Sequence, residues 1–478
     1  MSRHAATSGR TRPLNRLPGR HNGRVIPRPP LPAGPFLVVG LARSGVAAAL
    51  ALRSLGAEVV GCDSGAVPDA RRGELEGAGV AVHAGATGLE LLPAAGAVVK
   101  SPGVPAEAPV IVAAREAGLP VLGELELGWR LVPNETIAVT GSNGKTTTVE
   151  LLGHLHRVAG RPAVVVGNVG TALTSLVGGE LPADTVVVCE ASSFQLEDTL
   201  AFAPDAGVLL NLAEDHLDRH GTFDAYKAAK LEVFARQPPG SVAVAPAALA
   251  AEIGGEGERV LFATAGEAGG VERGRACEDL GARLVDRDGA LWWDGARLIA
   301  HAELRLRGAH NRENAMAAAA VALARGLAPE AVREGLATFA GVAHRLEEVA
   351  THDGVLYVND SKATNVASAI AGIESFDGGL HLILGGSGKG SDYAPLAAPV
   401  AERARAVYLI GETAPEIGAA LQGTGVPLQQ SGDLERAVAA ARAAARPGEV
   451  VLLSPACASF DQHADYEARG EHFRSIVA

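Results

Sequence analysis

A glycine-rich run with a single lysine, residues 140–147 (TGSNGKTT), has the residue types and spacing for chemistry on phosphate. It follows a β-branched run and precedes a helical pattern, which is the setting of a phosphate-binding loop. Backbone N–H groups there can surround a phosphate, Lys145 can neutralise the terminal phosphates and Thr146 can reach Mg²⁺. The spacing GxxGKT is shorter than the common GxxxxGKT, and a purely structural turn is the weaker alternative. The predicted ATP contacts in this loop are Gly141, Ser142, Asn143, Gly144, Lys145, Thr146 and Thr147.

Two further strand ends carry groups suited to a metal ion. Glu190 ends the apolar run TVVVCE, and Asp215 and His216 follow the run AGVLLN. Neighbouring parallel strands end at one edge of a sheet, so a carboxylate and an imidazole can point at the same metal and phosphates. A histidine taken singly is more often a surface residue than a ligand. Its neighbours here favour a role at the metal.

Lysine is rare in this chain, and its positions are informative. Of 42 basic residues only six are lysines, namely Lys100, Lys145, Lys227, Lys230, Lys362 and Lys389. A chain that otherwise carries its positive charge on arginine is expected to keep lysine where a compact ammonium or an amine that can lose its proton is needed. We interpret Lys100 and Lys227 as lysines retained by chance. The other four lie inside motifs.

The elements that position these residues follow a pattern of short β-branched runs and Ala/Leu-rich helical stretches, typical of parallel sheets with crossover helices. We predict an α/β protein with a Rossmann-like N-terminal domain, a central P-loop ATPase-like domain and a Rossmann-like C-terminal domain. Expected strands include residues 36–40, 57–63 and 136–140, and a helix is expected over about 311–325. The predicted domains are 36–130, 131–341 and 342–478, after a disordered basic tail over 1–35.

The composition limits the cellular environment and the kinds of binding partner expected for this chain. With 478 residues, 47% hydrophobic and 20% charged, the chain is typical of soluble globular proteins of several domains, and it has no apolar stretch of membrane-spanning length. Four scattered cysteines fit a reducing cytoplasm. Residues 1–35 carry seven arginines and no acid, so the net charge of −12 leaves −12 − 7 = −19 on the remainder. This acidic body argues against nucleic acid as a partner.

The basic first 35 residues lack the apolar stretch of a secretory signal. A transit peptide or a nucleic-acid-binding arm is an alternative, but the absence of an amphipathic period favours a solvated tail. We therefore expect removal of residues 1–33 to leave catalysis intact.

Five segments in order resemble the Mur ligases, the ATP-dependent amide-forming enzymes of peptidoglycan precursor assembly and relatives of folylpolyglutamate synthase. They are the loop TGSNGKTT, the strand end at Glu190, and residues 214–218 (EDHLD), 226–230 (YKAAK) and 308–314 (GAHNREN). The resemblance extends from about residue 36 to the C-terminus. It implies ATP and Mg²⁺ as requirements.

Three more segments resemble the D-glutamate-adding branch of that family: residues 190–197 (EASSFQLE), 359–365 (NDSKATN) and 454–462 (SPACASFDQ). Folylpolyglutamate synthases and the ligases that add diaminopimelate or lysine carry an aspartate, alanine, histidine and asparagine-proline run where this chain reads NDSKATN. The resemblance thus implies a ligase that joins D-glutamate to UDP-N-acetylmuramoyl-L-alanine through an acyl phosphate. We further expect a cytoplasmic monomer with no nucleic-acid or membrane partner. A folylpolyglutamate synthase is the first alternative.

The same resemblance implies roles for individual residues. Catalysis is assigned to Lys145, His216 and Lys230, with Lys230 carrying a carbamate formed from CO₂. The metal site is assigned to Thr146, Glu190, His216 and Lys230. The remaining ATP contacts are assigned to Asn311, Asn314, Arg345 and Asp360. The D-glutamate side is assigned to Lys362, Thr364, Lys389, Ser459 and Phe460. The base that deprotonates the amine of D-glutamate is left unassigned.

The N-terminal turn, residues 40–45 (GLARSG), has Ala42 where a dinucleotide fingerprint has its second glycine. The methyl group would crowd a pyrophosphate, which weakens an NAD or FAD interpretation. In a chain of this family the turn would instead receive the UDP pyrophosphate. The UDP substrate contacts so implied are Arg43, Ser44, Asp63, Ser64 and Asn168.

A different class of function stays open at this point. The loop TGSNGKTT and the turn GLARSG could serve a nucleotide-regulated binding protein without amide chemistry. The presence of Lys230, Lys362 and Lys389 in a lysine-poor chain speaks against it.

Overall fold

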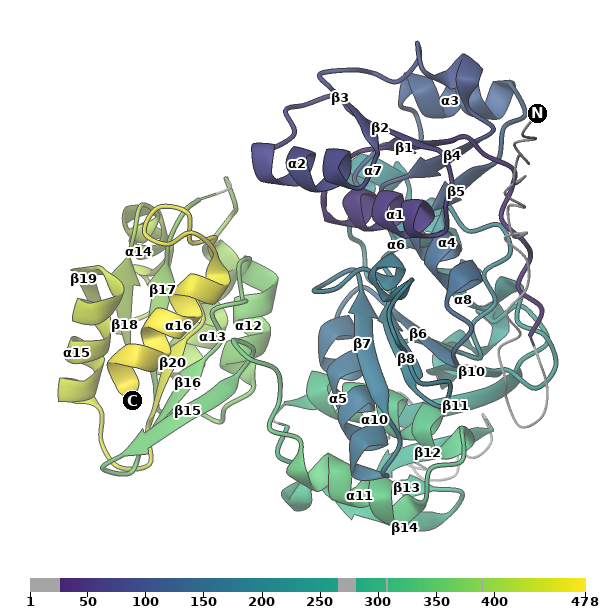
Figure 1. Ribbon diagram of the computed structural model, residues 1–478. Coiled ribbons are helices and arrows are strands. Elements are labelled where there is room, and N and C mark those ends of the chain that lie inside the picture. The colour runs from purple at the N-terminus through teal and green to yellow at the C-terminus, as the bar shows by residue number, and fades with distance from the viewer. Residues whose placement is uncertain (1–25, 265–280, 307, 389) are drawn as a thin grey trace, which may run out of the picture. The chain divides into compact units, whose positions relative to one another are not determined.

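The computed structural model describes residues 26–264, 281–306, 308–388 and 390–478 (Figure 1). They form two compact units. The first contains the N-terminal and central sheets and runs through residue 299, with 316–335 added. The second contains residues 300–315 and 336–478. The three-part α/β architecture expected from the sequence is confirmed.

The N-terminal sheet is five-stranded and parallel, in the order β3-β2-β1-β4-β5. Alternate residues of β1 face opposite sides, because Phe36 and Val38 join one apolar cluster and Leu37 and Val39 join the other. Both faces are therefore covered, as expected of a parallel sheet. Its strands are β1 (Phe36–Val39), β2 (Val59–Asp63), β3 (Ala81–Ala84), β4 (Ala97–Lys100) and β5 (Val121–Gly123). Its helices are α1 (Arg43–Ser54), α2 (Asp69–Gly77), α3 (Pro109–Glu116) and α4 (Glu124–Leu131).

The central sheet has nine strands in the order β14-β13-β12-β11-β10-β9-β6-β8-β7. The middle strands are parallel, whereas β12 and β13 pair antiparallel. The strand predicted over 136–140 is β6, with the same bounds. The strands are β6 (Thr136–Thr140), β7 (Ala163–Gly167), β8 (Val186–Glu190), β9 (Ala206–Leu209), β10 (Val242–Pro246), β11 (Glu258–Thr264), β12 (Ala282–Arg287), β13 (Ala290–Trp293) and β14 (Ala296–Ala300).

Helices of the central region connect the strand ends that carry the motifs. Helix α5 packs on β7 and β8, and α8 packs on β6 and β9. The side chain of Thr222 accepts a hydrogen bond from Ala225 N and so caps the start of α8. The helices are α5 (Lys145–Val158), α6 (Ser193–Leu196), α7 (Leu217–His220) and α8 (Phe223–Ala235), followed by α10 (Ala309–Ala324) and α11 (Pro329–Thr338).

The C-terminal sheet has the order β15-β16-β20-β17-β18-β19, parallel except for the edge strand β15. In β17, Leu380, Leu382 and Leu384 pack on one side and Ile383 on the other, so helices cover both faces. The strands are β15 (Glu347–His352), β16 (Val355–Asn359), β17 (Leu380–Gly385), β18 (Ala404–Ile410), β19 (Leu428–Gly432) and β20 (Val450–Leu453). The helices are α12 (Val366–Glu374), α13 (Ala397–Arg403), α14 (Ala414–Leu421), α15 (Leu434–Ala444) and α16 (Tyr466–Val477).

Residues 26–35, here called the N-terminal strap, differ from the expected disordered tail. Ile26 packs against the apolar core of the central sheet, and Leu31 packs against that of the N-terminal sheet. Arg28 donates to the carbonyl oxygens of Trp129, Val132 and Asn134, the last at 2.7 Å. The predicted end of the tail at residue 35 is therefore too late. A guanidinium that satisfies three carbonyls of the connection between two domains orders the strap, and composition alone does not reveal those acceptors.

Helix α1 begins at Arg43, because Val46 N already donates to Ala42 O at 3.0 Å. Among the described residues, none of the helices combines the length and the apolar character that crossing a bilayer requires.

Candidate functional site

The loop after β6 has the geometry of a phosphate-binding loop at the start of a helix. Helix α5 begins at Lys145, so its first N–H groups face the loop. Lys145 Nζ donates to Gly141 O at 2.8 Å and to Ser142 O at 2.9 Å. The ammonium therefore lies over the loop that would surround the phosphates. Asn143 N donates to Asn211 Oδ1 at 2.9 Å, which fixes the loop to the segment after β9.

Glu190, at the end of β8, is joined to two of the predicted residues. Thr146 Oγ1 donates to Glu190 Oε2 at 2.9 Å, and Asn168 Nδ2 donates to Glu190 Oε1 at 3.1 Å. Glu190 is only 2% exposed. Hydroxyl and carboxylate oxygens at the mouth of a phosphate-binding loop are the ligands that Mg²⁺ takes together with phosphate oxygens. Thr146 and Glu190 therefore fit the implied metal.

Lys230 lies in the same place, although it comes from α8. Its side chain is buried, Nζ donates to Gly141 O at 2.8 Å, and it lies 4.5 Å from the ring centroid of Tyr226. Burial, reinforced by the nearby charge of Lys145, lowers the pKa of Lys230 to about 7. Two lysines thus converge on one carbonyl, and one of them readily becomes a neutral amine.

His216 stands beside this cluster on a more exposed segment. It precedes α7 in a left-handed conformation with φ 52°, and its ring is 4.9 Å from that of Phe194. Its Nε2 is 3.5 Å from Asp215 Oδ2. The side chain is 49% exposed, so it is free to reach a ligand. No direct contact joins His216 to Glu190 or Lys230 within the described residues, and its predicted metal role stays a prediction.

Tyr226 and Asn211 support the loop and were not among the predicted site residues. The hydroxyl of Tyr226 is 2.9 Å from Ser142 Oγ, and Ser142 Oγ also donates to Ala213 O at 2.9 Å. Tyr226 belongs to the YKAAK segment, four residues before Lys230 and so on the same face of α8. That spacing is the signal that could have identified it.

The N-terminal turn is tied to both sheets of the first unit. Asp63 Oδ2 accepts from Leu41 N at 2.7 Å, and Asp63 Oδ1 accepts from Gly65 N at 2.9 Å. Asp63 therefore holds the backbone of the turn. Arg43 donates to Gly170 O at 3.1 Å, which brings it beside the loop that carries Asn168. Ser44 is half-buried and Ser64 is exposed.

The second unit collects several predicted ATP contacts. Arg345 and Asn311 line one small pocket, and Asn314 Nδ2 donates to Asn311 Oδ1 at 3.2 Å. Asp360 accepts from Ser454 Oγ at 2.7 Å and from Leu346 N at 3.2 Å. Burial raises the pKa of Asp360 to about 7, against the opposing effects of its hydrogen bonds and of Arg345.

The predicted D-glutamate residues lie around the carboxyl ends of the C-terminal strands. Lys362 Nζ is 5.3 Å from the ring centroid of Tyr466, and the half-buried Thr364 donates its backbone N–H to Lys362 O. Ser459 is buried, whereas Phe460 is 71% exposed. Lys389 lies outside the described residues. The predicted roles of this set stay predictions.

Two strand ends in different domains need glycine for the same reason. A Cβ on Gly167, at the end of β7, would lie 2.1 Å from Glu190 O, and a Cβ on Gly385, at the end of β17, would lie 2.0 Å from Ile410 O. Both residues have φ of +121°. Only glycine allows these strands to turn this close to their neighbours. The turn at Gly167 leads directly to Asn168, a predicted substrate contact.

Comparison with known proteins identifies the family. Three family models match in chain order: the Mur ligase MurD-like N-terminal domain over residues 35–123, the Mur ligase middle domain over 139–322, and the Mur ligase glutamate ligase domain over 344–457. The chain belongs to the Mur ligase family. Its three sheets correspond in order to these three domains.

Individual Mur ligases extend the comparison. A UDP-N-acetylmuramoylalanine–D-glutamate ligase from Acidobacterium capsulatum is 42% identical over 92% of this chain and 95% of its own length. One from Anaeromyxobacter dehalogenans is 44% identical over 92% of this chain and 96% of its own. Among solved structures, the MurF ligase from Thermotoga maritima in complex with ADP covers 88% of this chain and 94% of its own with a TM-score of 0.57 at 17% identity. The UDP-N-acetylmuramate–alanine ligase from the same organism gives 0.56 at 19% identity, over 92% of this chain and 98% of its own. These two structural matches support the fold.

Proposed function

We propose that this Mur ligase adds D-glutamate to UDP-N-acetylmuramoyl-L-alanine at the expense of ATP, in peptidoglycan precursor synthesis. The observation that carries the proposal is the identity of 42% over 92% of the chain to a relative named for that reaction. Local geometry supports it, because Lys145, Thr146 and Glu190 converge on a loop suited to a nucleoside triphosphate.

The chemistry requires an activated carboxylate, since a carboxylate at neutral pH is a poor electrophile. The alanine carboxylate attacks the γ-phosphorus of ATP; the new O–P bond forms as the bond to the bridging oxygen breaks, and ADP leaves with that electron pair. Lys145 neutralises charge on the transferring group, and the loop aligns it. Mg²⁺, held by Thr146 and Glu190, would supply further neutralisation of the phosphate oxygens.

The second step forms the amide. The free amine of D-glutamate attacks the acyl carbon, loses a proton to a base, and expels phosphate with the electron pair of the C–O bond. We propose His216 for the second metal site. The amino acid would be held by Lys362, Thr364, Lys389, Ser459 and Phe460. Arg43, Ser44, Asp63, Ser64 and Asn168 would hold the UDP substrate.

We also propose that Lys230 carries a carbamate. Its amine adds to CO₂, forming an N–C bond and releasing one proton, and the product is an anion at the end of a long side chain. The supporting geometry is a buried amine beside Lys145, whose ammonium would pair with that anion. An unmodified ammonium would repel Mg²⁺, whereas a carbamate would orient it.

The remaining proposals concern the setting of the enzyme. We propose that it acts in the cytoplasm as a monomer and uses no nucleic-acid or membrane partner. Light scattering of the purified protein at assay concentration checks the monomer. A stable dimer mass would contradict it.

A substrate panel tests the proposed activity. Phosphate release is measured with ATP and either UDP-N-acetylmuramoyl-L-alanine plus D-glutamate or folate plus L-glutamate. We expect release with the first pair alone, and activity only with the second would identify a folylpolyglutamate synthase instead. Background release with both pairs would favour the nucleotide-regulated binding protein.

Lys389 provides a test within the amino-acid side. Lys389→Ala should raise KM for D-glutamate far more than KM for ATP, because we assign its ammonium to a substrate carboxylate. A defect dominated by KM for ATP would assign Lys389 to phosphate.

A further inference from the structure

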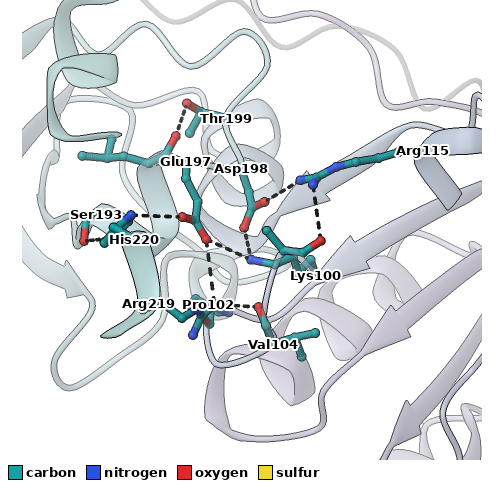
Figure 2. A network of polar contacts seen from close by, with 12 residues as sticks. Lys100, Pro102, Val104, Arg115, Ser193, Glu197, Asp198, Thr199, Arg219 and His220 are labelled. Atoms are coloured by element: carbon teal, nitrogen blue, oxygen red, sulfur yellow. Dashed lines mark hydrogen bonds and ion pairs between the residues drawn. The ribbon is translucent and has the colours of Figure 1, made fainter. Parts of the chain in front are cut away.

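A buried ion cluster joins the N-terminal sheet to the central sheet (Figure 2). Lys100, the last residue of β4, is 0% exposed, and its ammonium contacts Asp198 Oδ2 and lies 3.4 Å from Glu197 Oε1. Arg115, also from the N-terminal domain, lies 3.4 Å from Asp198 Oδ1. Charges buried to this degree are costly unless they are paired, so the cluster fixes the segment 197–198 against the end of β4.

A second contact holds the same two domains together from the opposite direction. Arg219 in α7 donates to Val104 O at 2.8 Å and to Pro102 O at 3.2 Å, as Figure 2 shows. Its guanidinium also lies 4.6 Å from the ring centroid of Phe194 in α6. Helix α7, which begins directly after His216, therefore holds the loop 101–104 in place through these hydrogen bonds.

On the N-terminal side, the cluster adjoins the turn proposed to receive the UDP pyrophosphate. Lys100 pairs with Val39 in the parallel ladder, one residue before Gly40. Ser101 N donates to Val39 O at 3.0 Å, and a Cβ on Gly40 would lie 2.9 Å from Ser101 Cβ. The turn therefore packs directly on the loop 101–104, which follows Lys100 and accepts the hydrogen bonds of Arg219.

On the central side, the cluster continues to the phosphate-binding loop. His220 Nδ1 is 3.7 Å from Glu197 Oε2, and His220 Nε2 is 3.0 Å from Ser193 Oγ. The His220 ring is 5.5 Å from that of Tyr226, and the Tyr226 hydroxyl is 2.9 Å from Ser142 Oγ. Contacts therefore run without a break from Lys100 to the nucleotide loop.

We propose that Lys100 is a positioning residue that couples occupation of the N-terminal turn to nucleotide binding in the central domain. The inference rests on the proposed function only for the identity of the two ligands. A ligand that orders the turn also orders the loop 101–104. Because the ion cluster joins this loop to α6 and α7, the ordering extends to the Tyr226–Ser142 contact. Lysine suits the position because two adjacent carboxylates share one compact ammonium.

The test measures coupling between two ligands. The Kd of a non-hydrolysable ATP analogue is determined by calorimetry with and without saturating UDP-N-acetylmuramoyl-L-alanine. In the wild type we expect the UDP substrate to tighten nucleotide binding at least about 5-fold. Lys100→Met should bring this ratio close to one, while the Kd of the nucleotide alone changes less than about 2-fold.

Two further variants keep the test decisive if Lys100→Met fails to fold. Lys100→Met combined with Asp198→Asn removes both charges of the pair, which is better tolerated than removing one. Arg219→Gln releases the loop 101–104 without burying a charge. Both should lose the coupling. Lys227→Met is the matched control, because Lys227 pairs with Glu252 on the outside of α8, and its coupling ratio should equal the wild-type ratio.

The outcomes separate this inference from the proposed function. Absence of coupling in a wild type that binds both ligands would overturn the inference, as would full coupling in folded Lys100→Met or in Arg219→Gln. Failure of the wild type to bind the UDP substrate at all would instead count against the proposed function.

Discussion

The nucleotide loop and the seam between the N-terminal and central domains are both polar, but they are built differently. The loop is a continuous run of eight residues, and within it Lys145 donates to Gly141 O and Ser142 O, four and three residues away. The seam joins Lys100 to Asp198 and Arg28 to Trp129, across 98 and 101 residues. A short motif can specify a ligand site locally, whereas the placement of that site relative to the other substrate depends on pairs that are distant in sequence.

The largest expected effect lies in the loop region, at Lys230. Lys230→Ala should lower kcat by on the order of 10² to 10³, the usual effect of removing one electrostatic group from an active site. Lys230→Arg should not restore activity, because arginine stays charged at neutral pH and cannot form a carbamate. A short-chain carboxylic acid should partly rescue Lys230→Ala and should not rescue Lys145→Ala. Full activity of Lys230→Arg would exclude the carbamate.

A second prediction concerns the pH dependence of stability at Asp205, a buried carboxyl beside the start of β6 in the central sheet. Burial raises the pKa of Asp205 to about 7, and Asp205 Oδ2 accepts from Thr136 N at 2.8 Å. A raised carboxyl pKa contributes stability that is present below the unfolded value near 4 and is lost as the pH rises through 7. From pH 4 to 8, Asp205→Asn should therefore gain up to about 4 kcal/mol in unfolding free energy relative to the wild type.

Urea unfolding at several pH values checks this prediction, with the exposed Asp184→Asn as control. The control should run parallel to the wild type. If Asp205→Asn also runs parallel, Asp205 titrates as an ordinary surface carboxyl, and burial does not raise its pKa.

The N-terminal strap provides a third test, in which two deletions of different length are compared. Removal of residues 1–25 should leave the urea midpoint unchanged, whereas removal of 1–33 or Arg28→Ala should cost about 2 kcal/mol, because three carbonyl oxygens lose a charged donor. The expectation that removal of 1–33 leaves catalysis intact then needs measurement well below the unfolding midpoint. Equal midpoints for both deletions would show that the strap adds no stability.

The smallest expected effect is at Arg43, an exposed side chain that spans the seam. Arg43→Ala should raise KM for the UDP substrate about 2- to 10-fold, the value of one ordinary hydrogen bond, with kcat nearly unchanged. Initial-rate kinetics measure both constants. A fall in kcat with unchanged KM would place Arg43 in the chemical step and weaken its assignment to the UDP substrate.

Sequence reasoning succeeded where the pattern is local. The strand over 136–140 follows from a short apolar run, and the position of Glu190 beside Thr146 follows from its place at a strand end, whereas the ligand roles of both residues stay predictions. Lys100 could not be assigned in this way. From the sequence, it is interpreted as a lysine retained by chance. Its side chain is fully buried and paired with two carboxylates, and this does not support that interpretation.

The strap shows the same limit from the opposite side. Residues 26–35 have the composition of a solvated tail, yet Arg28 finds acceptors in carbonyl oxygens that exist only once the chain between Trp129 and Asn134 has folded. The composition of a segment indicates whether it can bury enough apolar surface to become ordered. It does not report a specific set of acceptors about 100 residues away.

The two strand-end glycines restrict how this enzyme can diversify. Because a side chain at Gly167 or Gly385 would overlap a neighbouring carbonyl, neither turn can acquire a new contact by substitution at those positions. At these two turns, a change in ligand contacts must therefore come from the residues that follow the glycines, such as Asn168 and Ser387. Among relatives, the two glycines should be the fixed points of these turns, and any variation within the turns should fall on the residues beside them.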